Sequence, residues 1–390
     1  FHHKSGVLTA RSECLGVYYI NLRRMKSDRR ISETDLQIQN DWLMKIIGVG
    51  SVVPEKVLTN AMLEEFLDTS DEWIMQRIGV KTRHILKPEE GRGTSYLMTK
   101  AVKQLLDKTK VDPDSIEALL VATTTPDYHF PSVASLIIGN LGLKNCWGFD
   151  MEAACAGFLY ALEMGTNMIC SGRYKRIIIA GGDHMSSMTN YEDRNTCPIF
   201  GDGSACVMLE ATTEDVGVMD SFNRVDGKGY EFLHMAAGGS AQMPTHETVD
   251  QKLHYCYQEG RNVFKHAVTN MSNAVETIAK RNNLTNDNIA WIVPHQANVR
   301  IETAVAQRIN VPEEKVMVNV DHMANTSTGT LPLCLWEYES RLKKGDNLIF
   351  TAFGAGFSWG ALYMKWGYDG SKFADTPPEF YKEGEISREE

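Results

Sequence analysis

Apolar and polar positions follow two alternating patterns along most of the chain from Met44 onward. Short apolar runs between polar or glycine-rich segments predict buried strands at 45–50, 116–124, 146–151, 176–182, 203–210, 289–294, 315–320, 347–353 and 358–366. Longer stretches with apolar residues every three or four positions predict helices at 60–68, 71–77, 94–109, 132–141, 155–171, 260–282, 297–309 and 328–342. Such alternation of strands and helices indicates a layered α/β fold with a mostly parallel sheet in each half.

The last two-thirds of the chain repeat one plan: a strand, then a strand that runs into a loop and helix, then another strand. The copies are in close register, since Asp321 follows Asp150 by 171 positions. The first copy carries Cys155 after its second strand, and the second carries Asn325 at the matching place. Superposed copies would bring these two loops face to face, so we expect one active site built from two half-domains. The expected divisions are an N-terminal extension at 1–43, half-domains at 44–215 and 216–368, and a tail at 369–390.

Composition narrows the class of protein. With 390 residues, 43% of them apolar and 23% charged, the chain can bury a large core. A net charge of −10 argues against nucleic acid as a partner, and no apolar run approaches the roughly 18 residues of a membrane span. The eight cysteines lack metal or disulfide spacing, and His2 and His3 lack a further ligand. We therefore expect reduced thiols, a cytoplasmic protein and no metal site.

Cys155 is the candidate nucleophile. It opens the helix predicted at 155–171, where the helix dipole and free backbone N–H groups would lower the pKa of the thiol. Small neighbours, from Ala153 to Gly157, would let a substrate approach closely. The alternative is that Cys155 is a small buried apolar residue, as we expect for the other seven cysteines.

Two further residues complete the candidate site. His295 ends a predicted strand, which places its imidazole at the rim of a sheet. Asn325 lies in a polar turn, 324–332, that has little reason to follow a core strand unless its side chains face a site. An imidazole donor and an amide donor near a thiol can both stabilise a carbonyl oxygen as it becomes an enolate.

From Met44 to about Tyr368 the chain resembles β-ketoacyl-[acyl-carrier-protein] synthase III, a condensing enzyme of the thiolase fold. The matching stretches are Thr-Ser-Asp-Glu-Trp-Ile-Met-Gln-Arg at 69–77, Ala-Ala-Cys-Ala-Gly-Phe at 153–158, Ile-Phe-Gly-Asp-Gly at 199–203, Val-Pro-His-Gln-Ala-Asn at 293–298, Asn-Thr-Ser at 325–327 and Phe-Gly-Ala-Gly-Phe-Ser-Trp-Gly at 353–360. The resemblance implies an internally duplicated α/β/α/β/α fold with two mixed sheets. It also implies a homodimer that condenses a short acyl-CoA, acetyl-CoA first among them, with malonyl-acyl carrier protein and needs no cofactor.

The resemblance also implies a role for individual residues. Cys155 would accept the acyl group, while His295 and Asn325 would support decarboxylation. Backbone N–H groups of Cys155 and of the Ala355–Gly356 turn would form the oxyanion hole. The residues implied for coenzyme A are Thr69, Trp73, Arg77, Arg194 and Asn298, with the adenine between Trp73 and Arg194. Those implied for the carrier protein are Lys265, Arg300 and Arg308. Those implied for the acyl pocket are Phe130, Met185 and Phe200, with Phe130 crossing to the partner subunit.

Two positions depart from the family pattern. Ala324 stands where a glycine usually precedes the catalytic asparagine, so a positive φ there would strain the turn. Gln307 stands beside Arg308 where a second basic residue is usual, which would weaken carrier docking.

The order Cys155, His295, Asn325 also occurs in papain-like cysteine proteases, but the local surround of that family and a reason for the repeat are both missing. The open alternative is a condensing enzyme or acyltransferase of secondary metabolism that uses a longer or modified acyl donor.

Overall fold

The computed structural model describes residues 42–87 and 92–373. The N-terminal extension expected at 1–43 therefore lies outside the described residues up to position 41, and so does the expected tail from position 374.

The first sheet is mixed and contains five strands in the order β1-β7-β6-β4-β5. Their bounds are β1 Leu43–Val52, β4 Ala118–Ala122, β5 Trp147–Met151, β6 Arg176–His184 and β7 Asp202–Thr212. Strand β4 runs parallel to both β5 and β6, whereas β7 is antiparallel to β6 and β1. Because the carboxyl ends of β4, β5 and β6 meet at one edge, residues that follow these strands gather there.

The second sheet is also mixed, with the order β11-β12-β13-β8. Its strands are β8 Gly217–Val225, β11 Trp291–Pro294, β12 Asn347–Gly354 and β13 Ser358–Lys365. Only β11 and β12 run parallel; β13 is antiparallel to both of its neighbours. The expectation of a mostly parallel sheet in each half is therefore wrong, because a hairpin strand (β7 or β13) adds antiparallel pairs to each sheet. The mixed sheets implied by the resemblance are confirmed.

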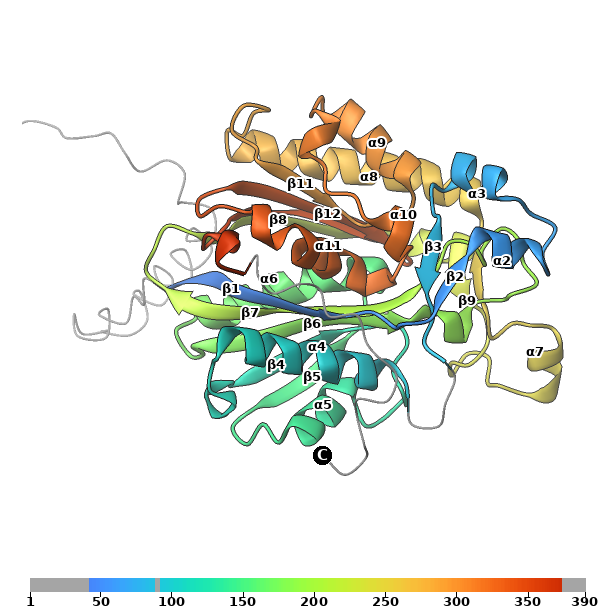
Figure 1. Ribbon diagram of the computed structural model, residues 1–390, viewed down its shortest axis with the longest axis horizontal. Coiled ribbons are helices and arrows are strands. Elements are labelled where there is room, and N and C mark those ends of the chain that lie inside the picture. The colour runs from blue at the N-terminus through green and yellow to red at the C-terminus, as the bar shows by residue number, and fades with distance from the viewer. Residues whose placement is uncertain (1–41, 88–91, 374–390) are drawn as a thin grey trace, which may run out of the picture. The chain divides into compact units, whose positions relative to one another are not determined.

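Helices and sheets alternate in layers (Figure 1). Helices α4 Thr94–Thr109 and α5 Val133–Leu141 cover the outer face of the first sheet. Helices α8 Gly260–Arg281 and α9 Val299–Arg308 lie on the outer side of the second sheet. Between the sheets lie α6 Gly157–Cys170 and α11 Thr330–Tyr338, which contact strands of both. The sequence explains the central pair: most residues of α11 are buried, and α6 buries apolar side chains over most of its length. The layer order α/β/α/β/α is thus confirmed.

Shorter elements surround the ends of the sheets. They are β2 Val57–Thr59, α2 Asn60–Glu64, α3 Asp71–Arg77, β3 Thr82–His84, η2 Pro113–Ser115, η3 Ala154–Ala156, η4 Met185–Met188, η5 Gly227–Phe232, β9 Leu233–Met235, α7 His246–Asp250, β10 Cys256–Gln258, η6 Glu313–Lys315, α10 Val320–Met323, η7 Ser327–Gly329, η8 Glu339–Arg341 and η9 Gly370–Phe373. Strand β2 pairs with β3, and β9 pairs with β10.

The strand predicted at 315–320 is wrong. Only Val316 makes a single parallel bridge, to Ile292 in β11. The backbone N–H groups of Asn319 and Val320 instead donate to the side-chain oxygen of Gln296, at 2.8 and 3.1 Å. The chain therefore leaves the sheet and turns into α10, which leads to the loop of Asn325.

Candidate active site

Cys155 lies in η3, at the point where the chain leaves β5 and enters α6. The end of β12 comes very close to this turn: a Cβ placed on Gly354 would lie 2.6 Å from the backbone nitrogen of Cys155. Only glycine allows that approach. The end of β12, in the second sheet, therefore packs directly against the backbone of the candidate nucleophile.

The ionisation of Cys155 differs from the sequence-based expectation. Burial raises the pKa of the thiol to about 12, although its hydrogen bond to the Ser327 hydroxyl opposes the shift. The charges of Asp183 and Cys256 raise the pKa further, which places Cys256 among the neighbours of the nucleophile. The expected lowering of the thiol pKa by the helix start is therefore wrong, because desolvation outweighs the dipole. The resting residue is a thiol.

Ser327 connects Cys155 to Asn325. Its hydroxyl oxygen lies 3.7 Å from the Cys155 sulfur, and its backbone N–H donates to Asn325 Oδ1 at 2.8 Å. That second bond fixes the orientation of the amide, since the oxygen is used and the Nδ2 hydrogens are left for another acceptor. The Asn325 backbone is held by a bridge to Phe200, with hydrogen bonds of 2.9 Å to Ile199 and 3.1 Å from Gly201.

His295 follows β11 directly and is 3% exposed. Its backbone N–H donates to Thr351 in β12 at 2.8 Å, and its Nδ1 lies 2.7 Å from the hydroxyl of Thr330. Burial lowers the pKa of the imidazole to about 3, so the ring is neutral at physiological pH. The structure therefore links all three predicted catalytic residues through one segment, 325–330.

A buried carboxylate on the first sheet holds that segment in place. Asp183, at the carboxyl end of β6, accepts hydrogen bonds from the backbone N–H and hydroxyl of Thr328, at 3.0 and 2.8 Å. Its other oxygen accepts from the hydroxyl groups of Thr123, Thr124 and Thr125. Sequence reasoning missed Asp183, Ser327 and Thr330, because their roles depend on contacts between segments 35 to 172 positions apart.

The implied oxyanion hole lies beside the nucleophile. The hydroxyl of Ser358 is 2.8 Å from both the Ala355 carbonyl and the Ala153 carbonyl, so it ties the 355–356 turn to the turn that precedes Cys155. Gly356 has φ of +132°, a conformation that L side chains rarely adopt.

The residues implied for coenzyme A surround Trp73 on α3. Ser70 caps this helix by accepting from the Trp73 N–H, and the guanidinium groups of Arg194 and Arg77 lie 4.6 and 5.3 Å from the Trp73 ring centre. Among the described residues, Thr69 Oγ1 and Arg194 Nε are buried without a hydrogen-bond partner. Orphaned polar atoms in the region of an aromatic ring suit a polar ligand. In this structure the Arg194 side chain covers the ring, so an adenine would have to separate the pair.

Asn298 is already used by the fold. Its side-chain oxygen accepts from the Arg300 N–H at 2.9 Å, which caps α9, and its Nδ2 donates to the Arg77 carbonyl at 3.0 Å. The capping bond occupies the oxygen, and one of the two amide hydrogens remains for a ligand.

The three residues implied for the carrier protein do not form one group. Lys265 on α8 and Arg300 at the start of α9 are exposed, and the Arg300 guanidinium lies 5.4 Å from the ring of Phe264, beside Lys265. Arg308 lies eight residues further along α9, about 12 Å away. It donates to Asn273 at 2.8 Å and lies 3.9 Å from Glu276, so its charge is partly neutralised.

The acyl-pocket residues separate in the same way. Met185 and Phe200 are buried at 4% and 5% exposure, whereas Phe130 is 86% exposed. Phe130 therefore does not line an acyl pocket inside its own subunit.

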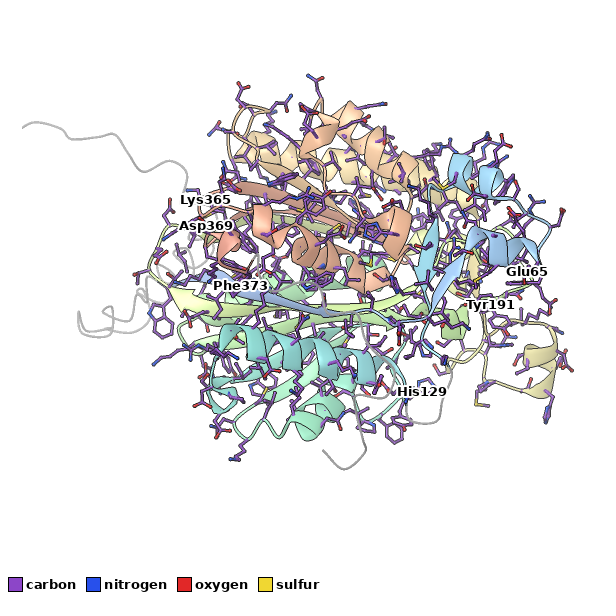
Figure 2. The ribbon with its side chains drawn as sticks, viewed as in Figure 1. Glu65, His129, Tyr191, Lys365, Asp369 and Phe373 are labelled. Carbon is purple, nitrogen blue, oxygen red and sulfur yellow. The ribbon has the colours of Figure 1, made fainter. Side chains whose placement is uncertain are left out.

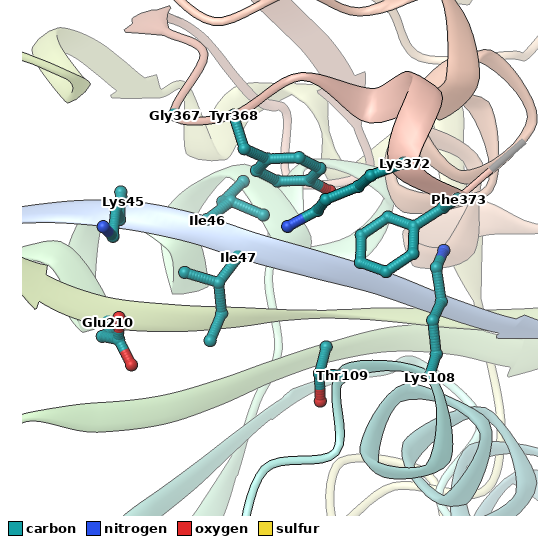
Figure 3. Close-up of a pocket in the computed structure, with 10 residues that line it drawn as sticks. All are labelled: Lys45, Ile46, Ile47, Lys108, Thr109, Glu210, Gly367, Tyr368, Lys372 and Phe373. Carbon is teal, nitrogen blue, oxygen red and sulfur yellow. The ribbon is translucent and has the colours of Figure 1, made fainter.

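A cavity of about 310 Å³ lies elsewhere, lined by Lys45, Ile46, Ile47, Lys108, Thr109, Glu210, Gly367, Tyr368, Lys372 and Phe373 (Figure 3). Phe373 lies on the opposite side of the ribbon from Tyr191 (Figure 2), which packs against the same apolar cluster as Trp73. Lys45 pairs with Glu210, which pairs in turn with Arg176 at the amino end of β6. The cavity therefore lies at that end of the strand, whereas Asp183 lies at the carboxyl end. This cavity is not the site of Cys155.

Within residues 42–87 and 92–373, no three His, Cys, Asp or Glu side chains gather closely enough to hold a metal ion. No helix in that part of the chain is both long and apolar enough to cross a bilayer.

Comparison with known proteins fits this geometry. Residues 149–227 match the model of 3-oxoacyl-[acyl-carrier-protein] synthase III, and residues 279–366 match the model of its C-terminal part.

A β-ketoacyl-[acyl-carrier-protein] synthase III from Phocaeicola vulgatus is 64% identical over 327 residues, which cover 84% of this chain and 98% of that protein. The crystal structure of the Aquifex aeolicus 3-oxoacyl-[acyl-carrier-protein] synthase III has 35% identity and a TM-score of 0.76, covering 83% of this chain and 100% of that one. The priming β-ketosynthase of the R1128 polyketide pathway has 28% identity and the same TM-score, covering 84% and 97%. The chain therefore belongs to the β-ketoacyl-[acyl-carrier-protein] synthase III family.

Proposed function

We propose that this chain condenses a short acyl-CoA, acetyl-CoA first among them, with malonyl-acyl carrier protein, releasing CO₂ and forming a β-ketoacyl-carrier protein. This is the initiating reaction of fatty acid synthesis by separate enzymes. The observation that carries the proposal is the segment 325–330, which contacts the Cys155 sulfur through Ser327 and the His295 ring through Thr330. A thiol, an amide donor and an imidazole on one support suit this two-step chemistry.

In the first step Cys155 attacks the thioester carbonyl of the acyl-CoA. A carbon–sulfur bond forms to Cys155, the bond to the coenzyme A sulfur breaks, and the thiol proton leaves with coenzyme A. The backbone N–H groups of Cys155 and Ala355 would stabilise the intermediate oxyanion.

In the second step the malonyl group loses CO₂ and leaves an enolate on the carrier-bound thioester. The Nδ2 hydrogens of Asn325 and an N–H of His295 would stabilise the enolate oxygen. The enolate carbon then attacks the acyl carbonyl on Cys155, the new carbon–carbon bond forms, and the thiolate leaves and is protonated. Loss of CO₂ drives the condensation, and one proton from solvent restores the Cys155 thiol.

The partners follow from the polar groups at the rim. Thr69, Trp73, Arg77 and Arg194 would bind coenzyme A, because the unpartnered Thr69 Oγ1 and Arg194 Nε can be satisfied by a polar ligand. Lys265 and Arg300 would meet the acidic carrier protein, with Arg308 contributing less since it is already paired. The cytoplasmic location expected from the sequence stays a prediction.

The test is a reconstituted condensation with acetyl-CoA, longer acyl-CoAs and malonyl-carrier protein, with the product read by mass spectrometry. We expect a β-ketoacyl-carrier protein with wild type and none with Cys155→Ala. Turnover of a long or modified donor with no turnover of acetyl-CoA would favour a role in secondary metabolism. Absence of product with every donor would contradict the proposed function.

A further inference from the structure

Thr330 is the described side chain that hydrogen-bonds to the His295 ring. The threonine is 1% exposed and the histidine 3% exposed, and Thr330 Oγ1 lies 2.7 Å from His295 Nδ1. Among the described residues the structure records no hydrogen bond to the other ring nitrogen, Nε2. The hydroxyl is therefore the group that decides which ring nitrogen carries the proton.

Two arrangements of hydrogens are possible at this contact. In one, the ring donates from Nδ1 to Thr330, whose own hydrogen then goes to the Ser327 carbonyl, 3.0 Å away. In the other, the hydroxyl donates to Nδ1 and the ring proton sits on Nε2. The Ser327 carbonyl already accepts the backbone N–H of Thr330, so it does not need the hydroxyl. Among the described residues neither arrangement gives Nε2 a partner, so the two differ at Nε2 only in whether it presents an N–H or a lone pair to a bound substrate.

The orientation of the Asn325 amide favours the second arrangement, with the proton on Nε2. The Ser327 N–H fixes Asn325 with its oxygen occupied and its Nδ2 hydrogens available. An enolate oxygen needs a second donor, and a histidine with a bare Nε2 would instead present a lone pair to that oxygen.

We propose that Thr330 is a positioning residue that donates to His295 Nδ1 and so keeps the proton on Nε2, the tautomer that stabilises the enolate. The inference rests on the proposed function. One segment then sets both donors: Ser327 orients the amide of Asn325, and Thr330 orients the imidazole of His295. Thr330 is assigned no contact with the substrate and acts through the His295 ring.

Thr330→Val removes the hydroxyl with little change of shape, and Thr330→Ser restores it. Thr326→Val is a matched control, because Thr326 is buried in the same segment and its hydroxyl has no partner among the described residues. We expect Thr330→Val to keep acylation by acetyl-CoA and the KM for malonyl-carrier protein, and to lose decarboxylation by on the order of 10²-fold, as for a lost oxyanion donor. Thr330→Ser and Thr326→Val should stay within a few-fold of wild type.

The tautomer is read directly from ¹⁵N chemical shifts of His295 in the whole protein, assigned with His295→Gln. We expect the proton on Nε2 in wild type, Thr330→Ser and Thr326→Val, and a shift toward Nδ1 in Thr330→Val. A wild-type ring protonated on Nδ1 would overturn the proposal whether or not any variant folds, and so would full decarboxylation by Thr330→Val. If wild type releases no CO₂ from malonyl-carrier protein, the proposed function fails instead, while the wild-type tautomer still decides the proposal about Thr330.

Discussion

At the scale of single residues, Ala324 shows strain at the entrance to the catalytic loop. Its φ of +60° and ψ of −168° lie in a region that is essentially reserved for glycine, and the residue is 1% exposed. The family's glycine is therefore the residue that this backbone favours. From the sequence, strain at Ala324 depended on whether its φ is positive. The structure shows that it is.

Ala324→Gly should raise the free energy of unfolding by about 1 kcal/mol, since relief of ~1–3 kcal/mol of strain exceeds the entropy cost of glycine. Denaturant unfolding measures the change. Ala101→Gly, in the interior of α4, is the control and should lower stability by about 1 kcal/mol. A loss of stability at both positions would mean that Ala324 is not strained.

The thiol of Cys155 gives a second prediction at this scale. Because burial raises its pKa to about 12, its alkylation by the neutral reagent iodoacetamide should rise steadily with pH up to about pH 10 without a plateau, whereas an ordinary thiol with a pKa of about 8.5 levels off near that pH. Peptide mass spectrometry resolves the label on Cys155, and a free peptide thiol provides the reference plateau. A plateau near neutral pH in the protein would show instead that the helix start controls the thiol.

At the scale of elements, the site depends on three segments from two sheets: η3, the end of β11 and the segment 325–330. Since Asn325 and His295 are placed to act on the enolate, His295→Ala and Asn325→Ala should still accept an acyl group on Cys155. Both should lose release of CO₂ from malonyl-carrier protein by on the order of 10²–10³-fold. Single-turnover acylation and CO₂ release are measured separately. Equal loss of both half-reactions would contradict the division of roles.

The sequence predicts elements well where the local signals are strong. The structure has α3 at 71–77 and α4 at 94–109, as the pattern predicts; Ser70 caps α3, and α4 carries a continuous apolar face. It missed β8, an edge strand whose residues are mostly half-buried and so lack a clear apolar run. It also predicted a strand at 315–320, where the amide of Gln296 draws the backbone away from the sheet.

The residues of the candidate site, too, could be predicted only where a local sequence signal marks them. Cys155, His295 and Asn325 could be found because the repeat and the family motifs mark them. Their partners could not be found, because Asp183 and Thr330 act through hydrogen bonds that only the packed sheets create. The thiol pKa was misjudged for a related reason: a helix start is visible in a sequence, whereas the depth of burial is not.

At the scale of the whole molecule, the β5 edge of the first sheet has no neighbouring strand in the described chain. Strand β5 ends the strand order, Trp147 on it is 45% exposed, and Phe130 is 86% exposed. Exposed aromatic side chains beside a free strand edge are a liability unless another subunit covers them. We expect a homodimer through this edge, with Phe130 reaching the partner.

The protein should sediment at about twice its 43.7 kDa chain mass. Trp147→Glu should shift it toward the monomer, because a charge would enter the buried interface. Met243→Glu is the control: Met243 is 69% exposed near α7, away from β5, so the dimer should persist. A fully active monomer at micromolar concentration would contradict this assembly.

The central claim is that Cys155 carries the acyl group, and intact mass spectrometry after incubation with acetyl-CoA tests it most directly. We expect wild type to gain one acetyl mass, with the label on the peptide that contains Cys155, and Cys155→Ala to gain none. Addition of malonyl-carrier protein should remove the label from wild type as the condensation product forms. Persistence of the acetyl mass on Cys155→Ala, or a wild-type label on another residue, would contradict the account.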